Sequence, residues 1–223
     1  MKKKAILLGA TGLIGNHILA LLKEDDAFES IKVITRRPMD NFHPKIQIEV
    51  IDFNNHEQFS AAMAEGDLIF CAIGTTQKKV KGDKKAYRKI DFDIPVYAAK
   101  YGLQNGIQNF LLVSSVGANA KKGNFYLKLK GEVEETLIAQ HLKSLSIFRP
   151  SLLLGKRKEK RTAENLGQFF AKLLKVISPN NFKPIEAKNV AKAMVEAAKL
   201  NKEGTHFYHY QEMKEIVEQH AHN

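Results

Sequence analysis

The sequence predicts an α/β fold, a doubly wound sheet of parallel strands with helices on both faces. Short apolar segments alternate along the chain with longer segments of helical periodicity, and this alternation requires right-handed crossovers between parallel strands. The chain has 223 residues, of which 44% are hydrophobic, which is enough for the core of one domain. We therefore expect a single domain over residues 1–223, with a small lobe from about residue 151 onward.

Six segments have the composition of buried strands, and four have the spacing of helices. We expect strands at 4–9, 31–35, 46–52, 67–73, 109–115 and 145–150, and helices at 13–23, about 56–64, 84–101 and 126–139. In doubly wound sheets, ligands bind at the carboxyl ends of the strands, where the strand order reverses. Each loop that follows a strand is therefore a candidate binding segment.

The first strand leads into the first helix through a turn with three regularly spaced glycines, in LLGATGLIGNHILALL. The first glycine permits a tight turn, the second lets a diphosphate approach the backbone, and the third lets the helix pack against the strand. The helix N-terminus adds unpaired N–H groups and positive potential. Glycines alone would also suit a plain turn, but the strand before them and the helix after them favour dinucleotide binding. The residues of this turn expected to bind the cofactor are Gly9, Thr11, Gly12, Leu13, Ile14 and Gly15.

Two arginines, Arg36 and Arg37, follow the second strand, where an acid would recognise the ribose 2′-hydroxyl of NAD. Guanidinium groups suit a 2′-phosphate, because their planar fork donates two charge-assisted hydrogen bonds. We therefore predict NADP(H) rather than NAD(H); the alternative is a solvated basic turn closed by proline. Asp52 and Phe53, after the third strand, either flank the adenine or are a strand-ending acid and a core aromatic residue.

The fourth strand contains the single cysteine of the chain, Cys71, which we interpret as a buried structural thiol. The loop after it offers backbone and hydroxyl groups that could line a cofactor. A lysine-rich stretch follows; it would gather an anionic substrate or, in the interpretation we prefer, form a solvated loop. The residues expected to line the cofactor here are Ala72, Ile73, Gly74, Thr75 and Thr76.

The segment FYLKLKGEVEE, which spans residues 125–135, alternates at first like a strand, but its apolar residues recur at helical spacing from Tyr126 to Leu137. A helix places Tyr126 and Lys130 one turn apart on one face. Gly131 inside this helix costs about 1 kcal/mol relative to alanine, so we expect a close approach by a neighbouring element or ligand there.

The pair of Tyr126 and Lys130 suits proton transfer. Reduction of a carbonyl group needs a hydride and a proton for the developing alkoxide. A free phenol has a pKa of about 10, and a nearby ammonium favours the phenolate form. An ordinary amphipathic helix pair is the alternative.

The segments after the sixth strand give weaker indications. Pro150 ends that strand near the expected position of the nicotinamide, and the basic run to Arg161 would form either a lid or an exposed loop. Histidines at the C-terminal end lack a ligand set, so we read them as surface residues and expect no metal. They are His206, His209, His220 and His222.

The formal charge of +11 favours an anionic partner. Specific nucleic-acid binding ranks last, because no recognition module or interleaved aromatic residues accompany the basic residues. No apolar segment approaches the roughly 20 residues that span a bilayer, so we expect a cytoplasmic protein without a membrane span.

Several motifs together resemble a known family. The glycine turn, CAIGTT after the fourth strand, the paired serines Ser114 and Ser115, and the Tyr-x-x-x-Lys spacing resemble an atypical short-chain dehydrogenase/reductase. The segments GTTQKKVKGDKKAYRKIDFD, SSVGANAKKGNFYLKLKGEVEE and FRPSLLLGKRKEKRTAENL are similar to the Tat-interacting-protein family of NADPH-binding proteins. This resemblance runs from about residue 3 to about residue 198 and implies a Rossmann fold with NADP(H) along the strand ends.

The resemblance also implies roles for individual residues. Lys130 would hold the nicotinamide ribose, and a serine before Tyr126 would orient the substrate oxygen; Ser115 is the first candidate and Ser114 the second. We expect an NADPH-dependent reductase of a small carbonyl compound, with residues from about 151 onward completing the substrate side. The competing hypothesis is a regulator that binds NADPH and signals to a protein partner without turnover. An epimerase with bound NAD is a third.

Overall fold

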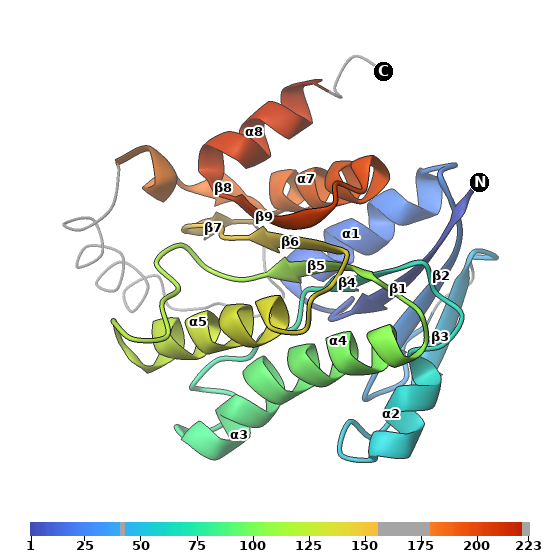
Figure 1. Ribbon diagram of the computed structural model, residues 1–223, viewed down its shortest axis with the longest axis horizontal. Helices are drawn as coiled ribbons and strands as arrows, with labels where there is room; N and C mark the ends of the chain where they lie inside the picture. The colour runs from blue at the N-terminus through green and yellow to red at the C-terminus, as the bar shows by residue number, and fades with distance from the viewer. Residues whose placement is uncertain (41–42, 156–178, 220–223) are drawn as a thin grey trace.

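The computed structural model describes residues 1–40, 43–155 and 179–219. Within them, seven strands form one sheet in which every neighbouring pair is parallel (Figure 1). The strands are β1 (Lys3–Leu8), β2 (Phe28–Thr35), β3 (Ile46–Val50), β4 (Leu68–Cys71), β5 (Asn109–Val113), β6 (Ser144–Phe148) and β9 (Gly204–Tyr208).

The strand order β3-β2-β1-β4-β5-β6-β9 reverses its direction of growth between β1 and β4. The chain winds outward from β1 to β3 and then, after returning, from β4 to β9. At such a reversal the loops after the two central strands pass to opposite faces of the sheet, which opens a crevice at the carboxyl ends. The loops after β1 and β4, which carry the glycine turn and residues 72–76, therefore flank this reversal.

Helices cover both faces of the sheet (Figure 1). One face carries α1, α7 and α8, and the other carries α2, α4 and α5, with α3 beside them. Two apolar cores separate these layers from the sheet. The helices are α1 (Leu13–Glu24), α2 (His56–Ala62), α3 (Lys84–Arg88), α4 (Ile94–Gln104), α5 (Phe125–Ile138), α7 (Ala187–Leu200) and α8 (Tyr210–Gln219).

Helix α1 shows why the sequence folds in this way. Ile14, Ile18 and Leu22 recur every four residues and are buried against the sheet, whereas Asn16 and Ala20 face solvent. The buried strand residues, such as Leu7 in β1 and Phe70 in β4, lie in the same core. This confirms the predicted doubly wound parallel fold and all six predicted strands, with shifts of up to three residues at their ends.

One predicted helix is interrupted. The chain over 84–101 forms α3, a π-helical turn at Lys89–Asp93, and then α4, which extends to Gln104. Pro95 lies in the first turn of α4 and has no N–H to donate to the carbonyl group four residues earlier. The backbone widens just before this proline, which places Asp91 within the π-helical turn.

Residues beyond 151 contribute to two parts of the fold. Strand β9 extends the main sheet beside β6, and α7 packs on α1. Strand β7 (Leu153–Leu154) pairs with β8 (Ile185–Glu186) in a separate two-stranded sheet, near a 3-10 turn at Pro179–Phe182. The assignment of this region to the substrate side stays a prediction.

Some predictions concern the C-terminal histidines and the basic run. His206 and His209 are partly buried rather than fully on the surface. The basic run at 156–161 and the last two histidines, His220 and His222, lie outside the described residues. None of the helices in the described ranges combines the length and the apolar character that crossing a bilayer requires.

Candidate functional site

The glycine turn brings α1 against the ends of β1 and β4. Gly9 has a φ of +87°, and a Cβ at this position would lie 2.6 Å from the Ala72 carbonyl group. The Gly12 N–H donates to the Gly9 carbonyl at 2.9 Å and closes the turn. A Cβ on Gly15 would lie 2.7 Å from the Gly9 carbonyl carbon. The predicted tight turn at Gly9 and close helix packing at Gly15 are therefore confirmed.

The start of α1 differs from the starts of three other helices. Side-chain oxygens of Asn55, Asp83 and Asn124 accept hydrogen bonds from the first turns of α2, α3 and α5, respectively. Helix α1 begins after Gly12, which has no side chain to act as a cap, and its first turn contains no acid. The N–H groups of this turn and the positive end of the helix dipole are thus available to an anion. This arrangement fits the diphosphate of a dinucleotide.

The residues expected near the adenosine half follow β2 and β3. Arg36 and Arg37 are exposed, and the Thr35 hydroxyl folds the chain back by accepting from the Arg37 N–H at 3.4 Å. Asp52 accepts hydrogen bonds from the backbone and side chain of Asn54, which lower the pKa of its carboxyl group. Phe53 is half-buried and lies edge-on to the ring of Phe59, with the centroids 5.0 Å apart.

The loop after β4 is fixed from two sides at Thr75. The Thr75 N–H donates to the Asp91 carboxylate at 2.7 Å, and the Tyr87 hydroxyl donates to the Thr75 carbonyl at 3.2 Å. Gly74 is exposed, and a Cβ at this position would lie 3.7 Å from the same carboxylate. Asp91 and Tyr87 were not predicted from the sequence. Tyr87, Asp91 and Pro95 are spaced four residues apart, and this spacing could have indicated that Tyr87 and Asp91 share one face of the helix.

Lys130 and Asp91 form a buried ion pair. The Lys130 Nζ lies 3.2 Å from Asp91 Oδ1, and the two side chains are 5% and 1% exposed, respectively. Burial alone would lower the pKa of the Lys130 ammonium. The attraction to Asp91 and the proximity of Tyr126 outweigh that effect, so the pKa of Lys130 lies above its ordinary value. Lys130 is therefore charged at neutral pH.

The segment that carries Tyr126 and Lys130 is helical, as predicted, and belongs to α5. The Asn124 side chain caps the helix by accepting from the Leu127 N–H at 3.0 Å. Tyr126 is half-buried and lies in the first turn of α5. The predicted close approach at Gly131 is confirmed, because a Cβ there would lie 2.7 Å from the Asn119 Cα and would overlap the Ala120 nitrogen.

The paired serines point to different partners. The Ser114 hydroxyl donates to the Glu134 carboxylate, which also accepts from Arg149. The Ser115 hydroxyl contacts the carbonyl oxygen of Val116 at 3.3 Å. Glu134 is 3% exposed and lies one turn beyond Lys130 on α5, a spacing that is visible in the sequence.

The remaining predicted residues lie at or just after the carboxyl ends of β4 and β6. Cys71 is buried as predicted, and burial raises the pKa of its thiol to about 11. Ala72 and Ile73 are half-buried at the end of β4, and Thr76 accepts from the Lys79 N–H at 3.0 Å. Pro150 is buried, and its carbonyl accepts from the Val116 N–H at 3.0 Å.

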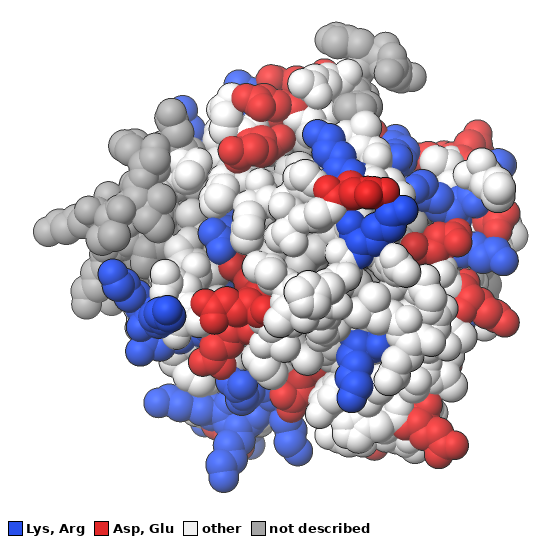
Figure 2. All heavy atoms as spheres, viewed as in Figure 1, with Lys and Arg blue, Asp and Glu red and all other residues white. Residues whose placement is uncertain are grey.

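Basic side chains gather beside this site. Figure 2 shows a group of Lys and Arg side chains over α3 and the start of α5. The exposed cations of 78–89 and 121–128 belong to this region. The two segments meet at Phe125, whose ring lies 5.6 Å from that of Tyr87 and 5.7 Å from the Lys84 Nζ.

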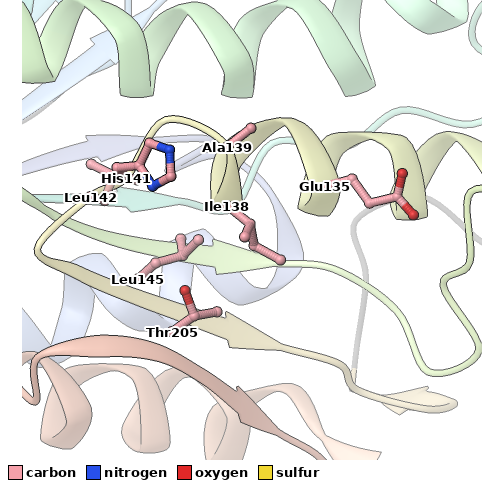
Figure 3. A pocket seen from close by; sticks show the side chains of 7 residues that line it. All are labelled: Glu135, Ile138, Ala139, His141, Leu142, Leu145 and Thr205. Atoms are coloured by element: carbon pink, nitrogen blue, oxygen red, sulfur yellow. The ribbon is translucent and has the colours of Figure 1, made fainter.

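A hollow of about 530 Å³ lies elsewhere, near the C-terminal end of α5 and the edge strand β9. Figure 3 shows Ile138, Leu145 and Thr205 around it. Leu145 lies near the amino end of β6, whereas Lys130 and the glycine turn lie at the carboxyl ends of the strands. The hollow is therefore not part of the candidate site.

Comparisons with known proteins agree with this geometry. A family described as NAD(P)H-binding matches residues 9–201. Protein FMP52, mitochondrial, from Candida albicans is 32% identical over 201 residues, which cover 86% of each chain. Protein HTATIP2 from Rattus norvegicus is 32% identical over 171 residues, which cover 75% of this chain and 70% of that protein.

Solved structures show the same fold at lower identity. A UDP-N-acetylglucosamine 4-epimerase from Methanobrevibacter ruminantium is similar with a TM-score of 0.71 at 18% identity, over 94% of this chain and 77% of that one. A Rossmann-fold NAD(P)-binding family protein from Shigella flexneri has a TM-score of 0.60 at 17% identity, over 89% of this chain and 87% of that one.

The relatives contradict one prediction. Proteins from Candida albicans, Debaryomyces hansenii and Scheffersomyces stipitis that are 32–34% identical to this chain are described as mitochondrial. The expected cytoplasmic location is therefore wrong by this comparison. The prediction rested on the lack of an apolar segment long enough to span a bilayer, and that lack does not distinguish one compartment from another.

The glycine turn, the uncapped start of α1 and the buried lysine on α5 thus occur in a chain whose relatives share most of its length. The chain belongs to the NAD(P)H-binding family, has a Rossmann fold, and is a homologue of HTATIP2 and of the FMP52 proteins.

Proposed function

We propose that this protein is an NADPH-dependent oxidoreductase that reduces a small carbonyl compound. Tyr126 serves as the acid/base, Lys130 as its electrostatic partner, and Ser115 as the group that orients the substrate oxygen. The observation that supports this proposal best is the charged, buried ammonium of Lys130 one helical turn from Tyr126. Burying an ammonium is costly, so its place beside a phenol at the carboxyl ends of the strands suggests a chemical purpose.

The chain offers a separate group to each part of the coenzyme. The first turn of α1, with its available N–H groups, binds the diphosphate. Arg36 and Arg37 bind the 2′-phosphate, which makes NADP(H) the preferred coenzyme. The loop at Gly74 and Thr75 lines the groove on the other side of the strand reversal. Lys130 binds the nicotinamide ribose. The bound coenzyme supplies the hydride.

The side chains of the site then carry out the proton transfer to the substrate. Ser115 donates a hydrogen bond to the carbonyl oxygen of the substrate and holds it near Tyr126. The Tyr126 hydroxyl transfers its proton to the developing alkoxide, and the phenolate that remains is stabilised by the Lys130 ammonium. A proton from solvent restores the phenol after the product alcohol leaves.

The experiment combines coenzyme binding with turnover. Calorimetric titrations with NADPH and NADH measure affinity, and the loss of NADPH absorbance with a panel of small aldehydes and ketones measures turnover. We expect Tyr126→Phe to retain NADPH affinity and to lose about 10²-fold to 10⁴-fold in kcat, as removal of a general acid does. Tyr97→Phe is the control and should keep both; Tyr97 lies on α4, is partly buried and stacks on the ring of Tyr101.

The outcomes separate the hypotheses. Turnover that Tyr126→Phe leaves unchanged would refute the assigned acid. Tight NADPH binding without turnover of any carbonyl compound would favour the regulator that signals to a protein partner. The lack of binding by either coenzyme would contradict the cofactor site itself.

A further inference from the structure

Asp91 contacts two segments of the candidate site at once. Its side chain is 1% exposed, and its Oδ1 lies 3.2 Å from the Lys130 Nζ. Its Oδ2 accepts the Thr75 N–H at 2.7 Å. One carboxylate therefore joins the helix that carries the proposed acid to the loop after β4. Both bonds are charge-assisted, which makes them stronger than neutral hydrogen bonds.

The position of Asp91 depends on an irregular piece of backbone. The residue lies in the π-helical turn between α3 and α4, immediately before the helix turn that contains Pro95. Such turns occur frequently at functional sites, because they move a side chain away from its regular helical position. Tyr87, four residues earlier, binds the carbonyl of Thr75 and fixes the same loop from its other side.

The charges around Lys130 come from three elements. Cys71 on β4 and Tyr126 on α5 act on it electrostatically, together with Asp91. The Cys71 thiol is neutral at physiological pH, because burial raises its pKa to about 11. Among the described residues, Asp91 is the carboxylate within 4.0 Å of this ammonium. It is thus the countercharge on which a charged Lys130 depends.

We propose that Asp91 is a positioning residue of the active site, which keeps Lys130 charged and in place beside Tyr126 and ties it to the coenzyme-facing loop at Thr75. The proposal rests on the proposed function, because it assigns the Lys130 ammonium a role in coenzyme binding. Asp91 itself touches neither coenzyme nor substrate in this scheme. Its effect on the reaction passes through Lys130.

The substitution Asp91→Asn removes the negative charge of this side chain and keeps its size and shape. The amide oxygen can still accept the Thr75 N–H, but the side chain no longer neutralises Lys130. A buried ammonium without a countercharge releases its proton at a lower pH than in the unmodified protein. Asp93→Asn makes the same chemical change two residues further along the same π-helical turn and serves as the control.

The first measurement is NADPH affinity as a function of pH, followed by coenzyme fluorescence. Between about pH 6.5 and about pH 9, we expect the affinity of Asp91→Asn to fall about tenfold or more, because Lys130 loses its charge in this range. The unmodified protein and Asp93→Asn should change far less. Lys130→Met should bind weakly at every pH, and Asp91→Asn should add little to it, because the two residues act as a unit.

The second measurement is stability, which does not depend on the coenzyme. Urea unfolding of the two single variants and of the double variant forms a double-mutant cycle. Asp91→Asn should destabilise the fold by leaving a buried charge unpaired, and adding Lys130→Met should recover part of that loss. This recovery would still be measurable if Asp91→Asn were too unstable for binding studies.

Each result bears on a different claim. A pH profile of Asp91→Asn that matches the unmodified protein, or effects of the two substitutions that simply add, would overturn the role of Asp91. If the unmodified protein fails to bind NADPH, the proposed function fails instead. In that case the stability cycle still decides whether Asp91 and Lys130 depend on each other.

Discussion

The substitution Gly15→Ala tests how closely α1 packs against the glycine turn at the end of β1. A Cβ at this position would overlap the Gly9 carbonyl oxygen and would lie 2.7 Å from the carbonyl carbon, where ordinary contact begins at 3.4 Å. The obstructing atoms are backbone, so no side chain can turn aside. Helix α1 must therefore move away from the end of β1 by about 0.7 Å or more.

The expected magnitude follows from two opposing effects. Alanine gains about 1 kcal/mol over glycine in helix propensity, whereas overpacking against backbone costs about 3 kcal/mol or more. The net loss in the free energy of unfolding is about 2 kcal/mol, or roughly 4–8 °C in Tm for a domain of this size. The displaced N–H groups of α1 should also weaken NADPH binding by about tenfold or more.

The assays are urea unfolding of the protein without coenzyme and calorimetric titration with NADPH. Asn16→Ala, exposed on the same turn of α1, is the control and should change both quantities little. A Gly15→Ala protein as stable as the original would show that the helix start is not packed against the strand end. Lower stability with undiminished NADPH affinity would show that the start of α1 does not hold the coenzyme.

Three further predictions concern charged and reactive groups. The double replacement of Arg36 and Arg37 by alanine should reduce NADPH affinity about tenfold or more and leave NADH affinity nearly unchanged, since only NADPH carries the 2′-phosphate; equal losses for both coenzymes in calorimetric titrations would argue against this contact. Arg149→Met leaves a buried carboxylate unpaired and should cost about 3 kcal/mol in urea unfolding, whereas Arg88→Met breaks an exposed pair and should cost less than about 1 kcal/mol; similar losses would contradict the difference in burial. The Cys71 thiol has a raised pKa of about 11, so the folded protein should react very slowly with an aromatic disulfide reagent at neutral pH and rapidly once unfolded; fast reaction of the folded protein would show that the thiol is accessible.

The parts of the fold that sequence predicted well are those with a strong local pattern. The six predicted strands are short apolar runs between polar segments, and the glycine turn is recognisable from the regular spacing of its glycines. Strand β9 was not predicted, because GTHFY mixes polar and aromatic residues at the exposed edge of the sheet. Its place beside β6 depends on pairing with a distant segment, and local periodicity carries no information about such pairing.

The candidate site divides in the same way. Tyr126 and Lys130 were found because both lie on one helix at a recognisable spacing. Asp91 was not found, because its role depends on a π-helical turn and on a partner from a different helix. Arg149 was missed for a related reason: its partner Glu134 becomes its neighbour only when α5 packs on the end of β6.

The polar groups along α5 have a consequence for how this helix can vary. Tyr126, Lys130 and Glu134 follow one another every four residues, and the last two, which are both buried, are paired with groups of opposite charge. Inserting or deleting one residue within this stretch would rotate the following groups by about 100° and separate cation from anion. Changes in length should therefore be tolerated in the loop before α5, whereas changes within α5 should prevent folding. A library of single-residue insertions would test this difference directly.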